Sequence, residues 1–452
     1  MSRARVLIVV ALAAALVVAA YFILRPPPGS SDTPGLLLPF DPARAVSITV
    51  TRPGGRTEMV RRTDQPGDWV VVLPRPGGAD EWPAGGSTIR GALRILSNLA
   101  PSRVADSAGT LGEGAVVVSV GVEDPSGVSN VSMSIDGRVL GGLVLARAEM
   151  PERGPLVWVD AQLADMLVRA GPREWRDARV LRDMAETSRI TLTGPSGTIS
   201  LARVMGRVYL REPIASEADP EAWIGLTRPL ASVEVVDYLD AGPPEGTGLQ
   251  AQCPVITLEQ DVRDPQTGRA ETRTTVLRVG QQADIAGKGV FAALTRPGAA
   301  ERVLVVTAEP LARIASDPAA YIARRVLSVP AGDVASLAVG ERRFTRTLRG
   351  WNRASPGPPA PAPPEDVQAI AALLKLLTET PAERVSLEPA RTEQGLVVEA
   401  QGLSGELLAS FDVEAAVDRG GPVTAVMLRS GRVLRVYTSR EVIAMWPWLS
   451  GQ

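Results

Sequence analysis

Apolar and polar residues alternate along much of the chain, in short runs that end at Pro or Gly. The clearest run is Ile48–Gly55, ITVTRPGG, and it returns almost unchanged at Ile190–Gly197 as ITLTGPSG. β-Branched residues at alternate positions followed by a Pro/Gly turn are typical of a strand that enters a hairpin. Because the copies stand so far apart, the chain repeats a whole folded module rather than one turn of a solenoid.

The pattern after the first copy predicts strands, one helix and then more strands. Ser87 is the predicted N-cap of the helix, after a Pro/Gly-rich loop at 74–86, and a hairpin turn is predicted at Asp136-Gly137. The apolar face of the helix consists of Ile89, Leu93, Leu96 and Leu99. The predicted strands are 46–51, 57–62, 68–73, 115–122, 128–135, 139–146 and 156–159, with short helices around 161–168 and 172–179.

The same order of elements is predicted twice more. In the second copy the helix is predicted to begin at Pro229, and in the third copy it is Glu365–Thr378. The predicted apolar faces of these helices are Leu230, Val233, Val236 and Leu239, and Val367, Ile370, Leu374 and Leu377. The predicted strands are 190–193, 199–204, 207–210, 255–262, 272–279 and 303–307, then 336–339, 343–348, 396–400, 407–413, 424–428 and 433–438.

The ends of the first two copies also match, as GPREWRDARVL at 171–181 and DPAAYIARRVL at 317–327. We therefore predict an α+β fold, in which an N-terminal transmembrane helix precedes three repeated modules of antiparallel strands with packed amphipathic helices. The predicted boundaries are a cytoplasmic tip and anchor at 1–25, a Pro/Gly/Ser linker at 26–40, and modules at 41–186, 187–327 and, more diverged, 328–452.

The segment Val6–Leu24 carries no charge and is long enough, as a helix, to cross a bilayer core of roughly 30 Å. Arg3 and Arg5 precede it and only Arg25 follows directly, which favours the N-terminus inside and the bulk of the chain outside. The alternative is a cleaved signal peptide with a small-residue site at 18–20. The apolar run continues past that site, so an anchor is preferred.

The amino-acid composition excludes several classes of catalytic and metal-binding site. The net charge of −2 gives no field for nucleic acid, and the chain has no histidine and one cysteine, Cys253. Histidine-dependent nucleophile systems, the usual zinc sites and intrachain disulfides are therefore excluded. Cys253 is read as a small apolar filler, with an interchain disulfide as the alternative. Only Lys288 and Lys375 are lysines, and such arginine excess fits either a GC-rich genome or bidentate anion recognition.

The candidate acids are read as structural. The densest clusters are Asp80-Glu81, Glu174/Asp177 and Glu217/Asp219/Glu221, which we place in turns and helix starts, where acids cap backbone amides. The acid-rich stretch 261–271 is a hairpin tip rather than a calcium loop, since it lacks the calcium register. Neither Gly287-Lys288-Gly289 nor Gly112-Glu113-Gly114 completes a phosphate or dinucleotide loop.

Two stretches leave an interaction open. Pro356–Pro364 is either an extended connector before the third helix or a polyproline ligand, and the connector is preferred. Trp446 and Trp448 are either core residues, matching Trp175 and Tyr321, or an exposed docking patch.

The chain resembles the domain-of-unknown-function-4340 family. The likeness rests on one N-terminal membrane segment and on strand pairs followed by a "GW…P" turn and an amphipathic helix, here Asp68-Trp69…Pro74 and Gly350-Trp351…Pro356. In the second module Val208-Tyr209 stands in place of Gly-Trp. The resemblance implies a bacterial envelope protein, in some members a companion of gliding-type or auxiliary ABC transport systems. It implies no catalytic residues.

The sequence thus predicts a membrane-anchored, extracytoplasmic (periplasmic) structural or interaction subunit of an envelope complex. The expected partners are the membrane, through one N-terminal helix, and envelope or transporter proteins, with no nucleic acid. No catalytic, cofactor-binding or metal-binding residues are predicted. The alternative is a carbohydrate or peptidoglycan binder or carboxylate-based hydrolase, with acids converging beside Trp69, Trp82 or Trp158 in a cleft.

Overall fold

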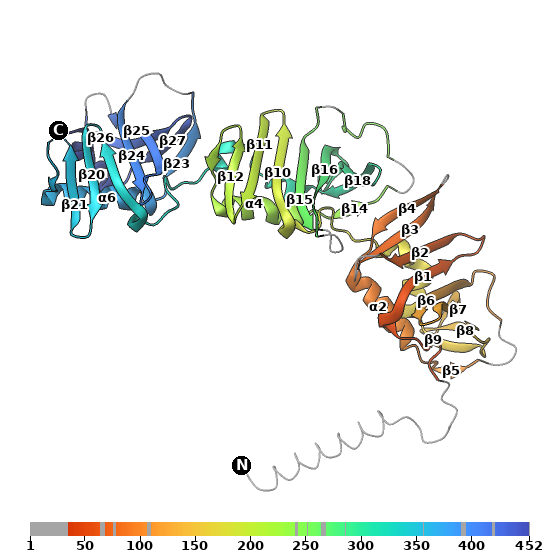
Figure 1. Cartoon of the computed structure of the whole chain (residues 1–452). Helices are drawn as coiled ribbons and strands as arrows, with labels where there is room; N and C mark the ends of the chain where they lie inside the picture. The colour runs from red at the N-terminus through yellow and green to blue at the C-terminus, as the bar shows by residue number, and fades with distance from the viewer. Residues whose placement is uncertain are drawn as a thin grey trace, which may run out of the picture. The chain divides into compact units, whose positions relative to one another are not determined.

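The structure is a computed structural model. It describes residues 35–63, 68–75, 78–105, 110–239, 243–250, 252–263, 268–284, 286–355, 357–389, 395–417 and 421–451. The chain divides into two compact units, Met1–Asp177 and Ala178–Gln452. The first unit contains one large sheet and the second unit contains two, and the colours of Figure 1 follow them along the chain.

The first sheet has nine strands, and every neighbouring pair is antiparallel. In spatial order the strands are β4 (Gly78–Pro83), β3 (Trp69–Arg75), β2 (Thr57–Arg62), β1 (Ala45–Thr51), β6 (Val116–Asp124), β7 (Gly127–Leu140), β8 (Leu143–Met150), β9 (Val157–Asp160) and β5 (Arg103–Val104).

This order follows from two meanders joined by a helix. The chain runs outward from β1 to β4 and then enters α2 (Gly86–Ser97), which carries it across the sheet to the opposite edge at β5. The second meander starts beside β1 with β6 and runs outward to β9. The first and fifth long strands therefore meet at the centre of the sheet.

The second and third sheets repeat this order strand for strand, which confirms the predicted repeat. The second sheet is β13 (Ser216–Glu217), β12 (Arg207–Glu212), β11 (Gly197–Val204), β10 (Thr187–Gly194), β15 (Val255–Arg263), β16 (Ala270–Gln282), β17 (Gly289–Thr295), β18 (Arg302–Thr307) and β14 (Val235–Asp237). The third is β22 (Ala360–Pro361), β21 (Gly350–Ser355), β20 (Arg342–Thr347), β19 (Val334–Val339), β24 (Leu396–Gly402), β25 (Leu407–Val417), β26 (Val423–Ser430), β27 (Val433–Tyr437) and β23 (Arg384–Leu387).

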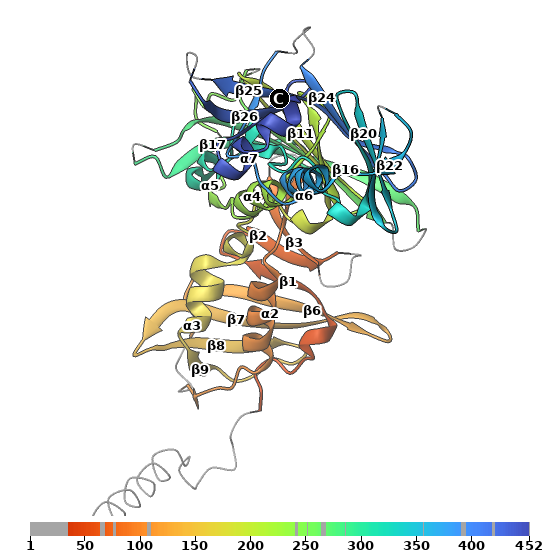
Figure 2. The same cartoon turned by 90° about the vertical axis from the view of Figure 1, so that its left-hand side faces the viewer.

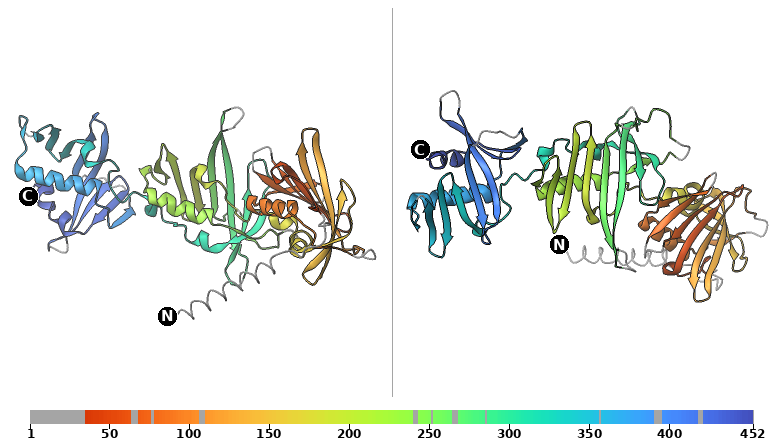
Figure 3. Two further views of the ribbon diagram at one scale, coloured as in Figure 1. Left: turned by 90° about the horizontal axis from the view of Figure 1, so that it is seen from below. Right: turned by 45° about the horizontal axis from the view of Figure 1, so that its top comes forward.

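One helix covers one face of each sheet: α2, α4 (Pro220–Ala231) and α6 (Pro364–Thr378). Figure 2 shows α2 lying across the first sheet, and Figure 3 shows α6 along the third. In the third module Ile370, Leu374 and Leu377 of α6 are buried in one cluster with Leu337 and Val398 of the sheet. Burying such apolar faces is the main source of stability of these modules.

Two backbone details recur in all three modules. The pairing between the first strand and its central partner shifts by one residue near the strand start, at Ala45/Ser47, Thr187/Arg189 and Val334/Ser336. The residues that lead into each module also make one equivalent hydrogen bond to a carbonyl near the end of its helix. The donors and acceptors are Leu37 to Leu99 (2.8 Å), Val180 to Val233 (3.0 Å) and Leu327 to Leu377 (2.9 Å).

The predicted α+β class is wrong. The chain is mostly antiparallel sheet, with 48% strand and 20% helix. The sequence pattern shows α2 and α6, but it misplaces α4, which ends at Ala231 so that Val233, Val236 and Leu239 lie beyond it, and it hides several strands. β4 falls in the Pro/Gly-rich stretch predicted as a loop, β17 was not predicted, and β5 and β13 are too short to show a period.

Three local predictions are also wrong. The helix α2 has Gly85, not Ser87, at its N-cap. The second helix begins at Pro220 because the carboxylate of Asp219 accepts a hydrogen bond from the amide of Glu221 at 3.0 Å, so Pro229 lies inside the helix.

Asp136-Gly137 is not a hairpin turn but an irregularity within β7. The buried carboxylate of Asp136 accepts a hydrogen bond from the amide of Gly112 at 2.9 Å, so the strand continues past it. The chain instead reverses at Gly141 and Gly142, where φ is 60° and 79°.

Within the described ranges, no helix is both long enough and apolar enough to span a bilayer. The predicted anchor at 6–24 and most of the predicted linker at 26–40 lie outside those ranges.

Candidate functional site

The repeated sheet allows one position to be compared in three modules. It lies on the second strand, directly opposite a buried position near the end of the first strand. The pairs are Val50↔Glu58, Leu192↔Ile199 and Val339↔Arg342. We call Glu58, Ile199 and Arg342 the hairpin-end residues. In each module this position faces the short helical segment that follows the last long strand. The residue type and its contacts differ from one module to the next.

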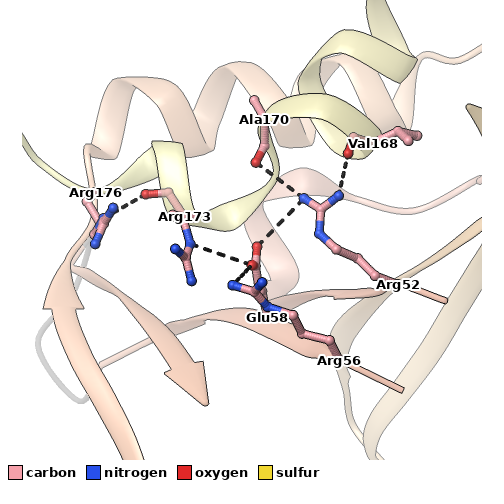
Figure 4. Close-up of polar contacts among 7 residues, drawn as sticks. All are labelled: Arg52, Arg56, Glu58, Val168, Ala170, Arg173 and Arg176. Carbon is pink, nitrogen blue, oxygen red and sulfur yellow. Dashed lines mark hydrogen bonds and ion pairs between the residues drawn. The ribbon is translucent and has the colours of Figure 1, made fainter. Parts of the chain in front are cut away.

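In the first module the hairpin-end residue is a buried carboxylate among arginines, shown in Figure 4. Glu58 is 2% exposed. Its Oε1 lies 3.2 Å from Arg56 Nη2 and 3.8 Å from Arg173 Nε, and its Oε2 lies 3.8 Å from Arg52 Nη2. Among the described residues, Oε2 accepts no hydrogen bond. A nearly buried carboxylate is tolerated here because several cations surround it.

Arg52 links this carboxylate to the next helical segment. Its guanidinium donates to the carbonyls of Val168 and of Ala170, the latter at 3.3 Å, in the π-helical turn η2 (Asp165–Ala170). Carbonyls at a helix C-terminus lack backbone partners and favour a cation. Gly171 follows with φ of +74°, and a Cβ there would lie 2.4 Å from Arg52 Nη2. The chain therefore needs glycine to turn beside Arg52.

The cluster continues towards the edge of the sheet. Arg176 donates from Nε to the carbonyl of Arg173 at 2.8 Å, and its guanidinium lies 5.8 Å from the ring centroid of Trp82. The indole of Trp82 donates to the carboxylate of Asp80 at 3.0 Å. Charged side chains thus fasten η2 and the following 3₁₀ turn, η3 (Pro172–Trp175), to strands β2 and β4.

In the third module the hairpin-end residue performs the fastening itself. Arg342 donates to the carbonyls of Trp448 and Leu449 in α8 (Trp446–Ser450), and its guanidinium lies 4.5 Å from the ring centroid of Trp448. The indole of Trp448 donates to Asp366 Oδ1 at 2.9 Å. The ring centroids of Phe344 and Trp448 lie 6.0 Å apart. Burial lowers the pKa of Arg342, and the repulsion of Arg353 acts in the same direction.

In the second module the hairpin-end residue is apolar, and an open cavity lies beside it. Ile199, Leu192 and Ile256 form one wall of a cavity of about 260 Å³. The opposite wall is Leu311, Ile314 and the two residues after them, which follow β18 through α5 (Ala308–Ala312). The mouth is formed by exposed residues of the repeated turn, Pro195, Ser196 and Gly197, and by Pro254.

The residues opposite the hairpin-end positions also differ in exposure between the modules. Val50 and Val339 are 0% and 1% exposed, whereas Leu192, their equivalent, is only half-buried. The cavity therefore opens the edge of the second module's core.

In the second module Tyr321 makes a local hydrogen bond within the segment that follows β18. Its hydroxyl donates to the carbonyl of Ala315 at 2.8 Å, and its side chain is buried in η5 (Pro318–Tyr321). Burial raises the pKa of Tyr321 to about 12. This hydrogen bond steadies the turn between α5 and η5 and does not reach the hairpin end.

The predicted acid clusters have structural partners. Asp80 and Glu81 lie on β4 rather than in a turn, and Glu81 faces the other side, where it pairs with Arg61 at 2.8 Å. Asp219 caps α4, and Glu217 on β13 accepts a hydrogen bond from Ser328 at 2.8 Å. Glu174 lies in the first turn of η3. The arrangement that hydrolyses glycosides, two carboxylates facing across a cleft, is not formed by Asp80 and Glu81 beside Trp82.

The predicted hairpin after Val255 is confirmed, since β15 and β16 pair from Val255↔Arg278 to Arg263↔Ala270. The tip itself, 264–267, lies outside the described ranges. Over the part of the chain that the structure describes, no group of three or more acid or cysteine side chains is placed to hold a metal ion. Cys253 is half-buried and forms no disulfide.

The remaining candidates are mainly structural. Of the Pro-rich stretch, Ala360–Pro361 forms the edge strand β22 and Pro364 opens α6, as a connector would. Trp446 and Trp448 are half-buried and pack against the core of the third module, so packing rather than a docking patch describes them.

Sequence reasoning missed the hairpin-end position. Arg52, Arg56 and Glu58 stand in and beside the repeated turn, where charges normally indicate solvent. The available signal was that the turn RPGGR carries two arginines where the second copy, GPSG, has none.

No family model matches the chain, and no curated protein matches it. The likeness to the domain-of-unknown-function-4340 family therefore stays a prediction.

Proposed function

We propose that this protein is a structural or interaction subunit of a cell-envelope complex. In this proposal the apolar N-terminal segment holds it at the cytoplasmic membrane, and the three sheet modules lie on the extracytoplasmic side. The observation that carries the proposal is the threefold use of one nine-stranded sheet, with its buried charges committed to fastening the fold. Proteins built from repeated modules often act by offering extended binding surfaces. An accessory role in an ABC-type transport system is one form of this proposal.

Whole-cell crosslinking tests the proposal. The full chain, carrying a C-terminal tag, is crosslinked in its own cells, extracted from membranes and purified, and the attached proteins are identified. We expect the same membrane or envelope proteins in every replicate. A matched chain with Leu16→Arg and Val17→Arg, which place charge in the apolar segment, should leave the membrane fraction and lose these partners. Recovery of the unaltered chain alone, or from the soluble cytoplasm, would refute the proposal.

A further inference from the structure

The hairpin-end position is filled by charged side chains in two modules and borders a cavity in the third. In the first and third modules, long charged side chains occupy the space between the hairpin end and the following helical segment. In the second module Ile199 stands at this position, Tyr321 bonds to Ala315 within the following segment, and a cavity remains. Among the described residues, charged side chains fill the equivalent space in the other two modules, so the cavity is not a general packing fault of the fold.

The lining determines what the cavity accepts. Its walls are mostly aliphatic, from Leu192, Ile199, Ile256, Leu311 and Ile314, and its few polar atoms are backbone groups and the hydroxyls of the rim. A charged ligand would lose its hydration here without gaining a partner. An uncharged apolar group would remove the half-buried leucine and its neighbours from water.

The volume limits the size of the ligand. An apolar cavity of roughly 150 Å³ is enough to stay dry and bind benzene, and sites for drug-sized molecules start at roughly 300 Å³. The cavity of about 260 Å³ lies between these sizes. In the third module the equivalent position contacts an indole, that of Trp448.

We propose that the second module binds one uncharged apolar group, between a single benzene ring and an indole in size, between Ile199 and Ile314. We take the occupant to be a small free molecule, because the cavity is smaller than sites for drug-sized molecules. A side chain of a partner polypeptide is the alternative that the test separates. This binding site goes beyond the proposed envelope role and does not depend on it.

Calorimetric titration of the full chain in lipid nanodiscs with indole tests the site. We expect saturable binding that Ile199→Arg, which introduces the residue of the third module, weakens at least tenfold. Ile314→Trp fills the cavity from the opposite wall and should have the same effect, which guards against a folding defect in either variant. Ile224→Arg introduces the same charge at an exposed position of α4 in the same module and should leave binding unchanged.

A second titration separates the two sources with the blocked peptide acetyl-Gly-Trp-Gly-amide. If the peptide displaces indole, the mouth admits a side chain on a polypeptide, and a partner protein is the source. If only free indole binds, the source is a small molecule. The inference is overturned if neither probe binds, or if both variants that alter the cavity bind indole as the unaltered chain does.

Discussion

The first and second modules share a strand order, a covering helix and a one-residue shift in the pairing of the first strand. They differ at the end of the first hairpin. The first module buries Glu58 among arginines and uses Arg52 to hold the next helical turn. The second module has Ile199 there, the hydroxyl of Tyr321 bonds within the following segment, and an apolar cavity remains. The backbone therefore does not dictate the chemistry at this position. In the second module an isoleucine stands where the other two modules have charged side chains, and the space beside it stays open.

The largest effect is expected from Glu58→Ala. It removes the buried carboxylate of this cluster and leaves Arg52, Arg56 and Arg173 close together without it. Because unpairing buried charges costs about 3 kcal/mol or more, the first module should lose about that much of its unfolding free energy. Hydrogen exchange resolved by peptide measures this in each module separately. Ile199→Ala is the matched change and should lower the stability of the second module less, about 2 kcal/mol, because Ile199 already borders a cavity. An equal loss would show that the charges of the first module do not fasten it.

Gly171→Ala should cost about 2 kcal/mol. The residue needs a positive φ, which strains alanine, and the added Cβ would displace the guanidinium of Arg52. Faster hydrogen exchange in residues 165–176, with the second and third modules unchanged, is the expected result. Gly91→Ala on α2 is the control, since a Cβ there meets nothing within 4 Å. If both alanine variants behaved alike, close contact at Gly171 would be unimportant.

Tyr321→Phe should cost about 1 kcal/mol at neutral pH, because it leaves the carbonyl of Ala315 without its donor. It should also change the response to alkali. The pKa of Tyr321 is about 12 when folded and about 10 when unfolded. The unfolded chain therefore releases this proton first, so the contribution is full below pH 10 and declines as the pH rises towards 12.

Urea unfolding of the second module between pH 9 and pH 11 tests this. The Phe variant should lose less stability over that interval than the unaltered chain. Tyr437, whose pKa burial also raises to about 12, is present in both chains and serves as an internal reference. Parallel pH profiles would mean that the Tyr321 hydroxyl does not hold the helical segment.

The smallest effect is expected from Arg56→Ala. Arg56 pairs with Glu58 at 3.2 Å, but its side chain is 50% exposed, and exposed ion pairs contribute about 0–1 kcal/mol. Arg52 and Arg173 remain beside the carboxylate. The expected change in hydrogen exchange of the first module is therefore below about 1 kcal/mol. A loss as large as that of Glu58→Ala would assign the fastening to Arg56 instead of Arg52.

The repeat could be predicted because its signals are local. The alternation in Ile48–Gly55 and Ile190–Gly197, and the apolar face of Glu365–Thr378, are fixed by one strand or one helix. One wrong prediction involves a contact made at a distance in the sequence, and the others involve local signals that the pattern hides. Asp136-Gly137 fits a turn until the amide of Gly112 occupies the carboxylate, and the edge strand β4 forms although its sequence is rich in Pro and Gly.

The candidate site was less predictable than the fold for the same reason. A charged turn such as RPGGR is predicted to be exposed to solvent unless the next helical segment is known to lie over it. Likewise, a cavity depends on what fills the equivalent space, and only the register of three strand pairs shows that Glu58, Ile199 and Arg342 are equivalent.

The place where the two meanders meet has a consequence for how each module assembles. Every other long ladder joins strands that are neighbours in the chain, whereas the central ladder joins Ile48 to Val120, Ile190 to Leu258 and Leu337 to Ala400. Closing such a long loop costs chain entropy before any contact compensates for it, and this slows folding. The hairpins therefore form early, and zipping of the central ladder sets the rate for each module. Until that ladder closes, the first strand of each half-sheet lacks its central partner, so we expect partly folded chains to be prone to exchange of matching half-sheets.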